Sequence, residues 1–371
     1  MSSRERLLAA FRSQPVDRIP VKVWNADPWT KVWHPSFQPI LDAALAKTDL
    51  VASWGMDGGY FLSDRSSVEM REEEYPSEHE GFIERRTVVE TKAGPLVSVT
   101  AYSPEHKPGR ILKHPIETPE QAQAWLDLPY KPIRGDTSGF FARVRELGER
   151  GIVIASIGVE PIYGVQILLG SELLALWSIE QRPLLRAMVE ALRLRVVDQV
   201  QYLLEQGVGP VFGYVGPELC IPPLMTPRDF REFVVEVDKS FTKPIKESGN
   251  LLWLHCHGKM SPVIRGFMEL GVDCLNPIEP PSATGDMTLR QAREIVGKSM
   301  CLEGNIEMDD LYRAPTWRIR ELVARAIEDA RGGGFILCPT SGFMEWPICG
   351  EQQRQNFLAF IEAGLEFGRN P

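Results

Sequence analysis

Two histidines with one residue between them are the strongest candidates for chemistry in this chain. They lie in the segment Leu254-His255-Cys256-His257-Gly258, at the end of an apolar run of strand length. Side chains alternate along a strand, so His255 and His257 share one face while Cys256 points away. Two imidazoles on one face at a strand end can hold a metal ion, although a histidine in such a place can also be purely structural.

A metal site needs more ligands than this pair supplies. Zinc takes three or four nitrogen, sulfur or oxygen ligands, so the others must come from neighbouring strands. The next apolar run ends at Glu279, and the last one ends at Cys338. The sequence therefore predicts a zinc site made of His255, His257, Glu279 and Cys338. Two of them have structural alternatives, since Glu279 could cap a helix and Cys338 could be a small buried core residue.

The same histidine pair is also typical of metal-dependent hydrolases of the amidohydrolase kind. Those barrels carry the pair on the first strand and need further histidines later in the chain. Here the other four histidines, His34, His79, His106 and His114, all precede the pair. The order of the histidines therefore argues against this class.

Further polar and aromatic residues follow the other predicted strands. In barrels and open parallel sheets, the chemistry lies just beyond the carboxyl ends of the strands. Of the residues that this rule selects, Trp24 and Tyr214 could instead be core aromatics, and Glu218 a carboxylate in the first turn of a helix. The selected residues are Trp24, Asn25, Glu160, Tyr214, Glu218, Asn305 and Ser341.

Eight apolar runs alternate with helical segments through most of the chain. Strands that alternate with helices form parallel β/α units, so we predict a (β/α)8 TIM barrel with a helical extension at its N-terminus. Two β-rich runs around residues 92–94 predict a hairpin within an insertion over about 62–115. A doubly wound open sheet is the alternative, but no GxGxxG or P-loop motif accompanies it. The predicted strands are IPVKVW, a run near 53–61, and residues 151–158, 210–216, 251–258, 273–279, 299–305 and 334–339.

Composition excludes several classes of protein. The 371 residues are 43% hydrophobic and 25% charged, which is typical of a soluble globular protein, and we expect a single domain over 1–371 in the cytoplasm. The net charge of −9 without a basic tract gives no basis for binding nucleic acid or membranes. No run approaches 18 apolar residues, and the six cysteines all lie between 220 and 349. We therefore expect neither a membrane span nor a disulfide framework.

Motifs along nearly the whole chain resemble the uroporphyrinogen decarboxylase superfamily. They are RERLLAAFRSQPVDRIPV, the GPE after the fourth strand, PPLMTPRDFREFV, LHCHGKM, LEGNIE and ILCPTSG. This superfamily has a barrel fold and includes the decarboxylase and zinc-dependent, cobalamin-linked methyltransferases that act on thiols. The decarboxylase holds its polycarboxylate substrate with an arginine-rich segment after the first strand, whereas this chain has VKVWNADPWTKVW there. The resemblance is therefore closer to the methyltransferase branch.

The methyltransferase pattern differs from this chain at two ligand positions. The pattern is His-x-Cys-Gly at the fifth strand, with a second cysteine in a Pro-Gly-Cys-Gly turn after the last strand. In this chain His257 replaces the first of these cysteines and Ser341 the second. Nitrogen and oxygen ligands leave zinc a stronger Lewis acid than thiolates do, which suits polarising an oxygen rather than activating a thiol.

The resemblance implies a zinc-dependent enzyme, a monomer or a homodimer, that moves a methyl group. The methyl group would pass between a small substrate and a corrinoid protein carrying methylcobalamin, or tetrahydrofolate. Tyr214 or Glu218 would orient the substrate or move a proton. Two alternatives remain: a metal-free decarboxylase or lyase for a small carboxylated molecule, and a non-catalytic ligand-binding protein. The substrate would be held by Trp24, Asn25, Glu160, Asn305 and Ser341.

Overall fold

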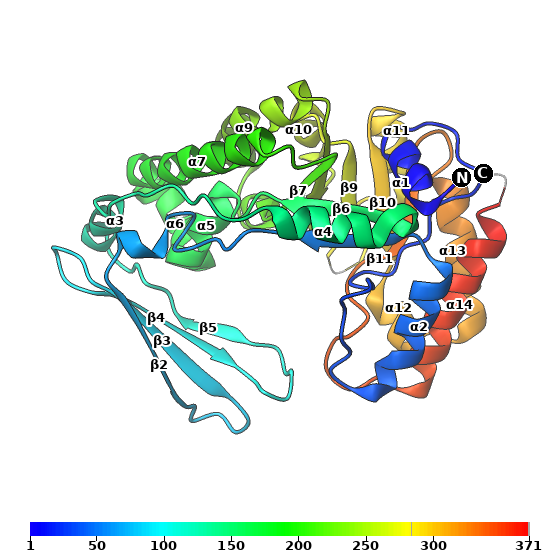
Figure 1. Cartoon of the computed structure of the whole chain (residues 1–371), viewed down its shortest axis with the longest axis horizontal. Helices are drawn as coiled ribbons and strands as arrows, with labels where there is room; N and C mark the ends of the chain where they lie inside the picture. The colour runs from blue at the N-terminus through cyan, green and yellow to red at the C-terminus, as the bar shows by residue number, and fades with distance from the viewer. Residues whose placement is uncertain (283, 370–371) are drawn as a thin grey trace.

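The computed structural model describes residues 1–282 and 284–369, and its central element is a curled sheet of seven parallel strands (Figure 1). Strands that are neighbours in the sheet also follow one another along the chain, as repeated β/α units require. The strands of this sheet are β1 (Leu50–Trp54), β6 (Gly151–Ser156), β7 (Val211–Val215), β8 (Leu251–His255), β9 (Cys274–Ile278), β10 (Cys301–Ile306) and β11 (Phe335–Pro339).

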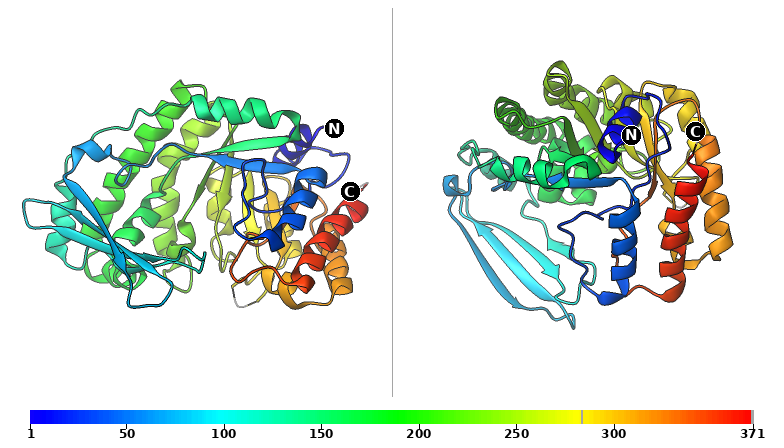
Figure 2. Two further views of the ribbon diagram at one scale, coloured as in Figure 1. Left: turned by 60° about the horizontal axis from the view of Figure 1, so that its bottom comes forward. Right: turned by 45° about the vertical axis from the view of Figure 1, so that its right-hand side comes forward.

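Helices lie around the outside of this sheet (Figure 2). Four of them, α1, α3, α8 and α11, begin at capping boxes. In these, Ser2, Thr118, Thr226 and Thr288 accept a backbone N–H of the first turn. The helices are α1 (Ser3–Phe11), α2 (Gln38–Lys47), α3 (Pro119–Leu126), α4 (Ser138–Leu147), α5 (Pro161–Leu169), α6 (Ser171–Glu180), α7 (Arg182–Glu205), α8 (Pro227–Phe230), α9 (Glu236–Glu247), α10 (Ile264–Glu269), α11 (Leu289–Val296), α12 (Met308–Arg313), α13 (Thr316–Asp329) and α14 (Glu351–Phe367).

Two apolar cores, one on each face of the sheet, hold the fold together. Inside the curl, Leu7 and Phe11 of α1 pack against side chains at the beginnings of the strands, such as Ile152, Val211 and Leu251. Helix α1 therefore closes the amino end of the barrel. The larger core lies between the outer face and the helices. Because both faces are covered, β8 and β9 are buried at every position.

The predicted first strand is reduced to one bridging residue, which nevertheless joins the two edges of the sheet. Val21 forms a parallel bridge with Leu337 of β11, where the Lys22 N–H donates to the Leu337 carbonyl and the Leu337 N–H to the Pro20 carbonyl, each at 2.9 Å. On the other side, the Asp49 N–H donates to the Val21 carbonyl at 2.8 Å. The Val21 N–H donates to the Asp49 carboxylate at 2.9 Å. The Asp49 carboxylate accepts the hydrogen bond from the Val21 N–H that a backbone carbonyl would accept in a regular strand. No regular eighth strand therefore forms here.

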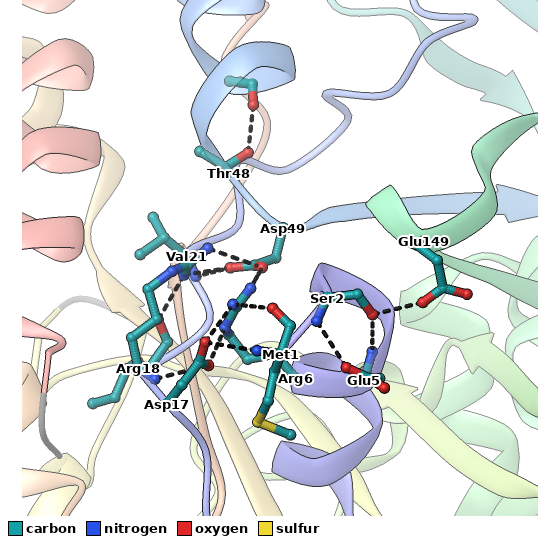
Figure 3. Close-up of polar contacts among 12 residues, drawn as sticks. Met1, Ser2, Glu5, Arg6, Asp17, Arg18, Val21, Thr48, Asp49 and Glu149 are labelled. Atoms are coloured by element: carbon teal, nitrogen blue, oxygen red, sulfur yellow. Dashed lines mark hydrogen bonds and ion pairs between the residues drawn. The ribbon is translucent and has the colours of Figure 1, made fainter.

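Asp49 is fully buried, and two arginines balance its charge (Figure 3). Arg6 of α1 and Arg18 each donate to its carboxylate at 2.6 Å. Arg6 also donates to Asp17 at 2.7 Å, and this hydrogen bond lowers the pKa of Asp17 well below its usual range. The cluster ties α1, the chain before Val21 and the start of β1 together at the amino end of the barrel.

The insertion after β1 holds a separate four-stranded antiparallel sheet that projects from the barrel (Figure 1). Its hairpin of β3 and β4 coincides with the predicted one. The charged segment MREEEYP also forms a strand, which alternation did not predict because its side chains are almost all exposed. The predicted run near 53–61 is a strand only at its start, because β1 ends at Trp54 and the Gly59 N–H donates to Asp57 in a turn beyond it. The strands of the second sheet are β2 (Met70–Pro76), β3 (Ile83–Val89), β4 (Leu96–Tyr102) and β5 (Arg110–Lys113).

Within residues 1–282 and 284–369, no single helix is long and apolar enough to cross a membrane. Only α5 and α6 taken together, with a bend of 107° between them, meet that length and composition.

Candidate active site

His255 and His257 meet at the carboxyl end of β8, where they form the centre of the candidate site. Their ring centroids are 4.6 Å apart, and the ring planes are 81° apart. His255 Nδ1 lies 2.7 Å from Oδ1 of Asn276, its partner across β9, and His257 Nδ1 lies 3.0 Å from Oε1 of Glu279. Both bonds use Nδ1, and among the residues that the structure describes no hydrogen bond occupies Nε2 of either ring.

The two histidines have opposite electrostatic surroundings. Burial, together with the charge of His257, lowers the pKa of His255 to about 4. Burial also disfavours charge on His257, but the hydrogen bond and the negative charge of Glu279 outweigh it and raise the pKa of His257. The environment therefore keeps His255 neutral and favours a protonated His257.

Two further carboxylates surround His257. Glu218, in the turn Pro217–Cys220 after β7, has a pKa raised by burial, which the charge of His257 partly offsets. Its Oε2 atom is buried with no hydrogen-bond partner in the described part of the chain. Glu307, which follows β10, accepts from Ser282 and Thr340 at 3.3 Å each. Burial and the charge of Glu279 raise the pKa of Glu307. Glu218 is thus near the pair, as predicted, and Glu307 joins it.

A buried ion pair, which the sequence patterns did not predict, lies beside the histidines inside the barrel. Lys22 Nζ lies 2.6 Å from Glu303 Oε1 of β10, with side-chain exposures of 3% and 1%. The same carboxylate accepts from Asn276 Nδ2 at 2.8 Å and from Trp253 Nε1 at 3.0 Å. A charged residue in the middle of each apolar run was the signal that could have identified both partners.

Trp24 connects the histidines to a cavity of about 180 Å³ at the carboxyl ends of β1, β6 and β7. Its ring centroid is 5.1 Å from that of His255 and 5.6 Å from that of Trp253. The structure thus brings Trp24 and Asn25 to the cavity, as predicted. The cavity is lined by Lys22, Trp24, Asn25, Asp27, residues 51–53, Ile154, Ser156, residues 213–215 and Trp253.

Tyr214 is among the residues that border the cavity, but its side chain points away from the histidines, into the helix layer. Gly213 faces the inside of the barrel, where a Cβ atom would lie 2.5 Å from Ile154, so the next side chain turns outward. The Tyr214 hydroxyl donates to Asp238 of α9 at 3.0 Å, and its ring packs on Phe241. The structure therefore gives Tyr214 a place in the helix layer rather than the catalytic place that we expected.

Glu160 also differs from the prediction. It is fully buried and caps α5, with Oε2 accepting the Tyr163 N–H at 2.8 Å. Burial raises the pKa of Glu160 to about 8, and it raises that of the neighbouring Asp238 as well. Glu160 therefore belongs to a buried carboxyl pair behind β7, and it is not among the residues that line the cavity.

The remaining predicted residues, Asn305, Ser341 and Cys338, have partners other than the two histidines. Asn305 is half-buried, and its Nδ2 donates to the Ile278 carbonyl at 2.8 Å. The Ser341 hydroxyl donates to Glu345 at 2.5 Å. Cys338 is fully buried inside the barrel, where burial, Lys22 and Glu303 determine its pKa, which is raised well above the usual value. Cys338 thus belongs with the buried ion pair rather than with His257.

The predicted zinc site is incomplete in this arrangement. The structure groups no three histidine, cysteine, aspartate or glutamate side chains that could hold a metal ion within its described residues. Glu279, the expected third ligand, uses Oε1 for His257 and for the Thr284 hydroxyl at 3.1 Å, and Oε2 for the Gly258 N–H at 2.9 Å. Two imidazoles alone fall short of the three or four ligands of a zinc site.

Comparisons with known proteins agree with the fold. A family model described as uroporphyrinogen decarboxylase (URO-D) matches residues 166–363, more than half of the chain. A solved methyltransferase from Methanosarcina mazei is similar over 99% of both chains, with 18% identity and a TM-score of 0.61. A B12-independent methionine synthase from Shewanella sp. W3-18-1, in complex with selenomethionine, aligns over 96% of this chain and 97% of its own. Its identity is 12%, and its TM-score of 0.48 is too low for any conclusion. A search of curated proteins found no match.

Proposed function

The chain belongs to the uroporphyrinogen decarboxylase family, and from this premise we propose that it is a methyltransferase. It moves a methyl group between a small substrate and a corrinoid protein or tetrahydrofolate. The observation that carries the proposal is the histidine pair, because Asn276 and Glu279 occupy both Nδ1 atoms and leave both Nε2 atoms for a reacting partner. The similarity to the M. mazei methyltransferase supports a shared fold only.

The chemistry of the cavity supports a small substrate rather than a porphyrinogen. Lys22 is the basic residue among the described residues that line the cavity, and Glu303 already balances its charge. A molecule with many carboxylates would need several free cations in this place. The indole of Trp24 and a volume of about 180 Å³ suit a small, partly apolar molecule instead.

We also propose that zinc takes part, with His255 and His257 as ligands through Nε2. Glu279 would complete the site only after releasing its present hydrogen bonds, and Cys338 lies beside Lys22 and Glu303 instead. When bound by nitrogen and oxygen ligands, zinc supplies a Lewis acid that lowers the pKa of an acceptor or leaving group. Glu218, beside His257, is the residue that would hold or move the proton.

One observation favours a second function, a metal-free decarboxylase or lyase acting on a small carboxylate. The surroundings of the two histidines lower the pKa of His255 to about 4 and raise the pKa of His257, and such a divergence is the arrangement of an acid–base pair. In that reaction His257, supported by Glu279, would anchor the carboxylate or donate a proton to the product carbanion.

Metal analysis separates these functions. Protein purified without a histidine tag is compared with His255→Ala/His257→Ala and with the control His79→Ala, whose side chain is exposed on the insertion. About one zinc per chain, lost in the double variant and kept in the control, supports the metal site. Zinc below about half an equivalent, or equal amounts in the double variant, contradicts it.

Turnover then identifies the reaction. Each protein is incubated with methylcobalamin or methyltetrahydrofolate and a panel of small thiols, alcohols and amines. Methyl transfer that needs both histidines supports the methyltransferase. Release of carbon dioxide from small carboxylic acids by zinc-free protein supports the alternative, and ligand binding without any turnover identifies a binding protein.

A further inference from the structure

We propose that Glu303 is a positioning residue which, through Asn276, fixes the tautomer of His255 so that Nε2 carries the lone pair. These three side chains lie on β10, β9 and β8 and are joined in sequence by hydrogen bonds of 2.8 and 2.7 Å. The chemical use of this lone pair rests on the proposed function. The tautomer itself follows from the hydrogen bonds alone.

Glu303 is the fixed point of this chain of bonds because it is a buried carboxylate that can only accept. Lys22 Nζ donates to its Oε1 at 2.6 Å. Burial opposes the charge on Lys22, but Glu303 outweighs that effect and raises the pKa of Lys22. Trp253 Nε1 at 3.0 Å and Cys274 Sγ at 3.6 Å donate to its second oxygen. Every neighbour of Glu303 is therefore required to present a hydrogen.

This requirement sets the orientation of the Asn276 amide, which could otherwise be turned by 180°. Only the Nδ2 group can donate to Glu303, so Oδ1 must face His255. Asn276 is fully buried, and its side chain lies between these two partners. The orientation is thus decided by the carboxylate and not by solvent.

The amide orientation in turn sets the proton on the imidazole. An amide oxygen cannot donate, so His255 Nδ1 must carry the hydrogen of the 2.7 Å bond. A neutral imidazole has one ring hydrogen, which leaves Nε2 with its lone pair. A metal ligand and a general base both need a nitrogen in this state.

The same carboxylate also holds the indole on which His255 rests. Trp253 donates to Glu303, and its ring is stacked 5.9 Å from the His255 ring, at an angle of 27°. Glu303 therefore acts on His255 by two routes, one that sets the proton and one that sets the plane of the ring.

Nitrogen-15 NMR of metal-free, full-length protein with labelled histidine tests the inference at neutral pH. The two ring nitrogens of a neutral imidazole have well separated shifts that report which one carries hydrogen, and His255→Gln identifies the signals of His255. We expect the Nδ1–H form in the wild type. In Glu303→Gln, the new amide can donate to Asn276 and allow the Asn276 amide to turn, so that its NH2 group faces His255. The ratio of the Nε2–H to the Nδ1–H form of His255 should then rise severalfold.

The control is Cys274→Ala, which removes a donor to the second oxygen of Glu303 and leaves the amide untouched, so its spectrum should match the wild type. An Nε2–H form in the wild type, or an unchanged tautomer in Glu303→Gln, would falsify the inference. If Glu303→Gln does not fold, Lys22→Met/Glu303→Gln removes both buried charges and is judged by the same shift. The measurement needs neither metal nor substrate, so a failed methyl-transfer assay leaves its result standing.

Discussion

Oε1 of Glu279 lies 3.0 Å from Nδ1 of His257, and this bond decides which of two uses the carboxylate has. Glu279 can bind a metal directly, or it can orient an imidazole and favour its protonated form. Its second oxygen accepts the Gly258 N–H at 2.9 Å, so in the present arrangement both oxygens serve the turn that carries His257. Glu279 here supports the histidine rather than completing a metal site.

Glu279→Gln should therefore lower the pKa of His257 in metal-free protein. The present pKa is raised because the hydrogen bond and charge of Glu279 outweigh burial, and glutamine keeps the shape without the charge. Histidine NMR titrations of the wild type and the variant measure the change, with Glu294→Gln on α11 as the control. Turnover should fall about 10–100-fold. An unaltered pKa of His257 would contradict this account of the pair.

Asp49→Ala should destabilise the protein by about 3–5 kcal/mol, since it leaves Arg6 without its buried partner and removes the acceptor of the Val21 N–H. Urea unfolding followed by circular dichroism measures the loss. Asp309→Ala removes an exposed partner of Arg313 and should cost less than about 1 kcal/mol. Similar losses in both variants would mean that the closure at Val21 does not depend on Asp49.

The Glu160–Asp238 pair predicts a loss of stability as the pH rises. Burial raises the pKa of Glu160 from 4.5 to about 8, so between these values the folded state binds more protons than the unfolded state. The free energy of unfolding should therefore decrease as the pH rises from about 4.5 towards 8. Glu160→Gln cannot ionise and should show a smaller decrease.

Urea unfolding of the wild type and Glu160→Gln at pH 5 and pH 8 measures this difference. The two proteins are compared by how much the free energy of unfolding changes between these pH values. Its absolute value is not used, because glutamine is also a poorer cap for α5 and lowers stability at every pH. Glu172→Gln, in the first turn of α6, is the control. Equal slopes in the wild type and Glu160→Gln would show that the carboxyl group is ionised throughout.

Lys22→Met should cost about 3–5 kcal/mol, because Glu303 would keep a buried charge without its cation. Lys22→Met/Glu303→Gln removes both charges. Its loss of stability should be smaller than the sum of the two single losses by about 1 kcal/mol or more. The exposed pair Lys47 and Glu362, 3.9 Å apart, provides the matched control cycle and should be additive. Additive losses at Lys22 and Glu303 would contradict a direct ion pair.

Strand positions and faces near the histidines followed from the sequence because local rules were sufficient. Apolar runs bounded by turns located β6 to β11, and alternation placed His255 and His257 together while turning Cys256 into the outer core. Alternation did not show which side chains of β7 face the inside of the barrel, because Gly213, which faces it, has no side chain. Alternation therefore left Tyr214 as either a pocket residue or a core aromatic, and its side chain lies in the core rather than at the expected catalytic place.

The buried ion pair could not be assembled from sequence for a different reason. Lys22 and Glu303 are separated by 281 positions, and each sits among apolar neighbours that resemble an ordinary strand. Their partnership depends on the curvature that brings the chain before β1 beside β10 and β11. The closure at Val21 was also hidden, because a carboxylate replaces the strand carbonyl that periodicity would require.

The short bridge at Val21 has a consequence for how the barrel finds its correct alignment. Lys22 is the next residue, so the same three-residue segment both joins the sheet edges and supplies the cation for Glu303. A shift of one residue in the pairing of this segment would turn Lys22 to the outer face of the sheet. Glu303 would then be left inside the barrel without its cation. The ion pair thus favours the correct register of the segment around Val21, because a shifted alignment would lose it. The single bridge at Val21 would not specify this register by itself.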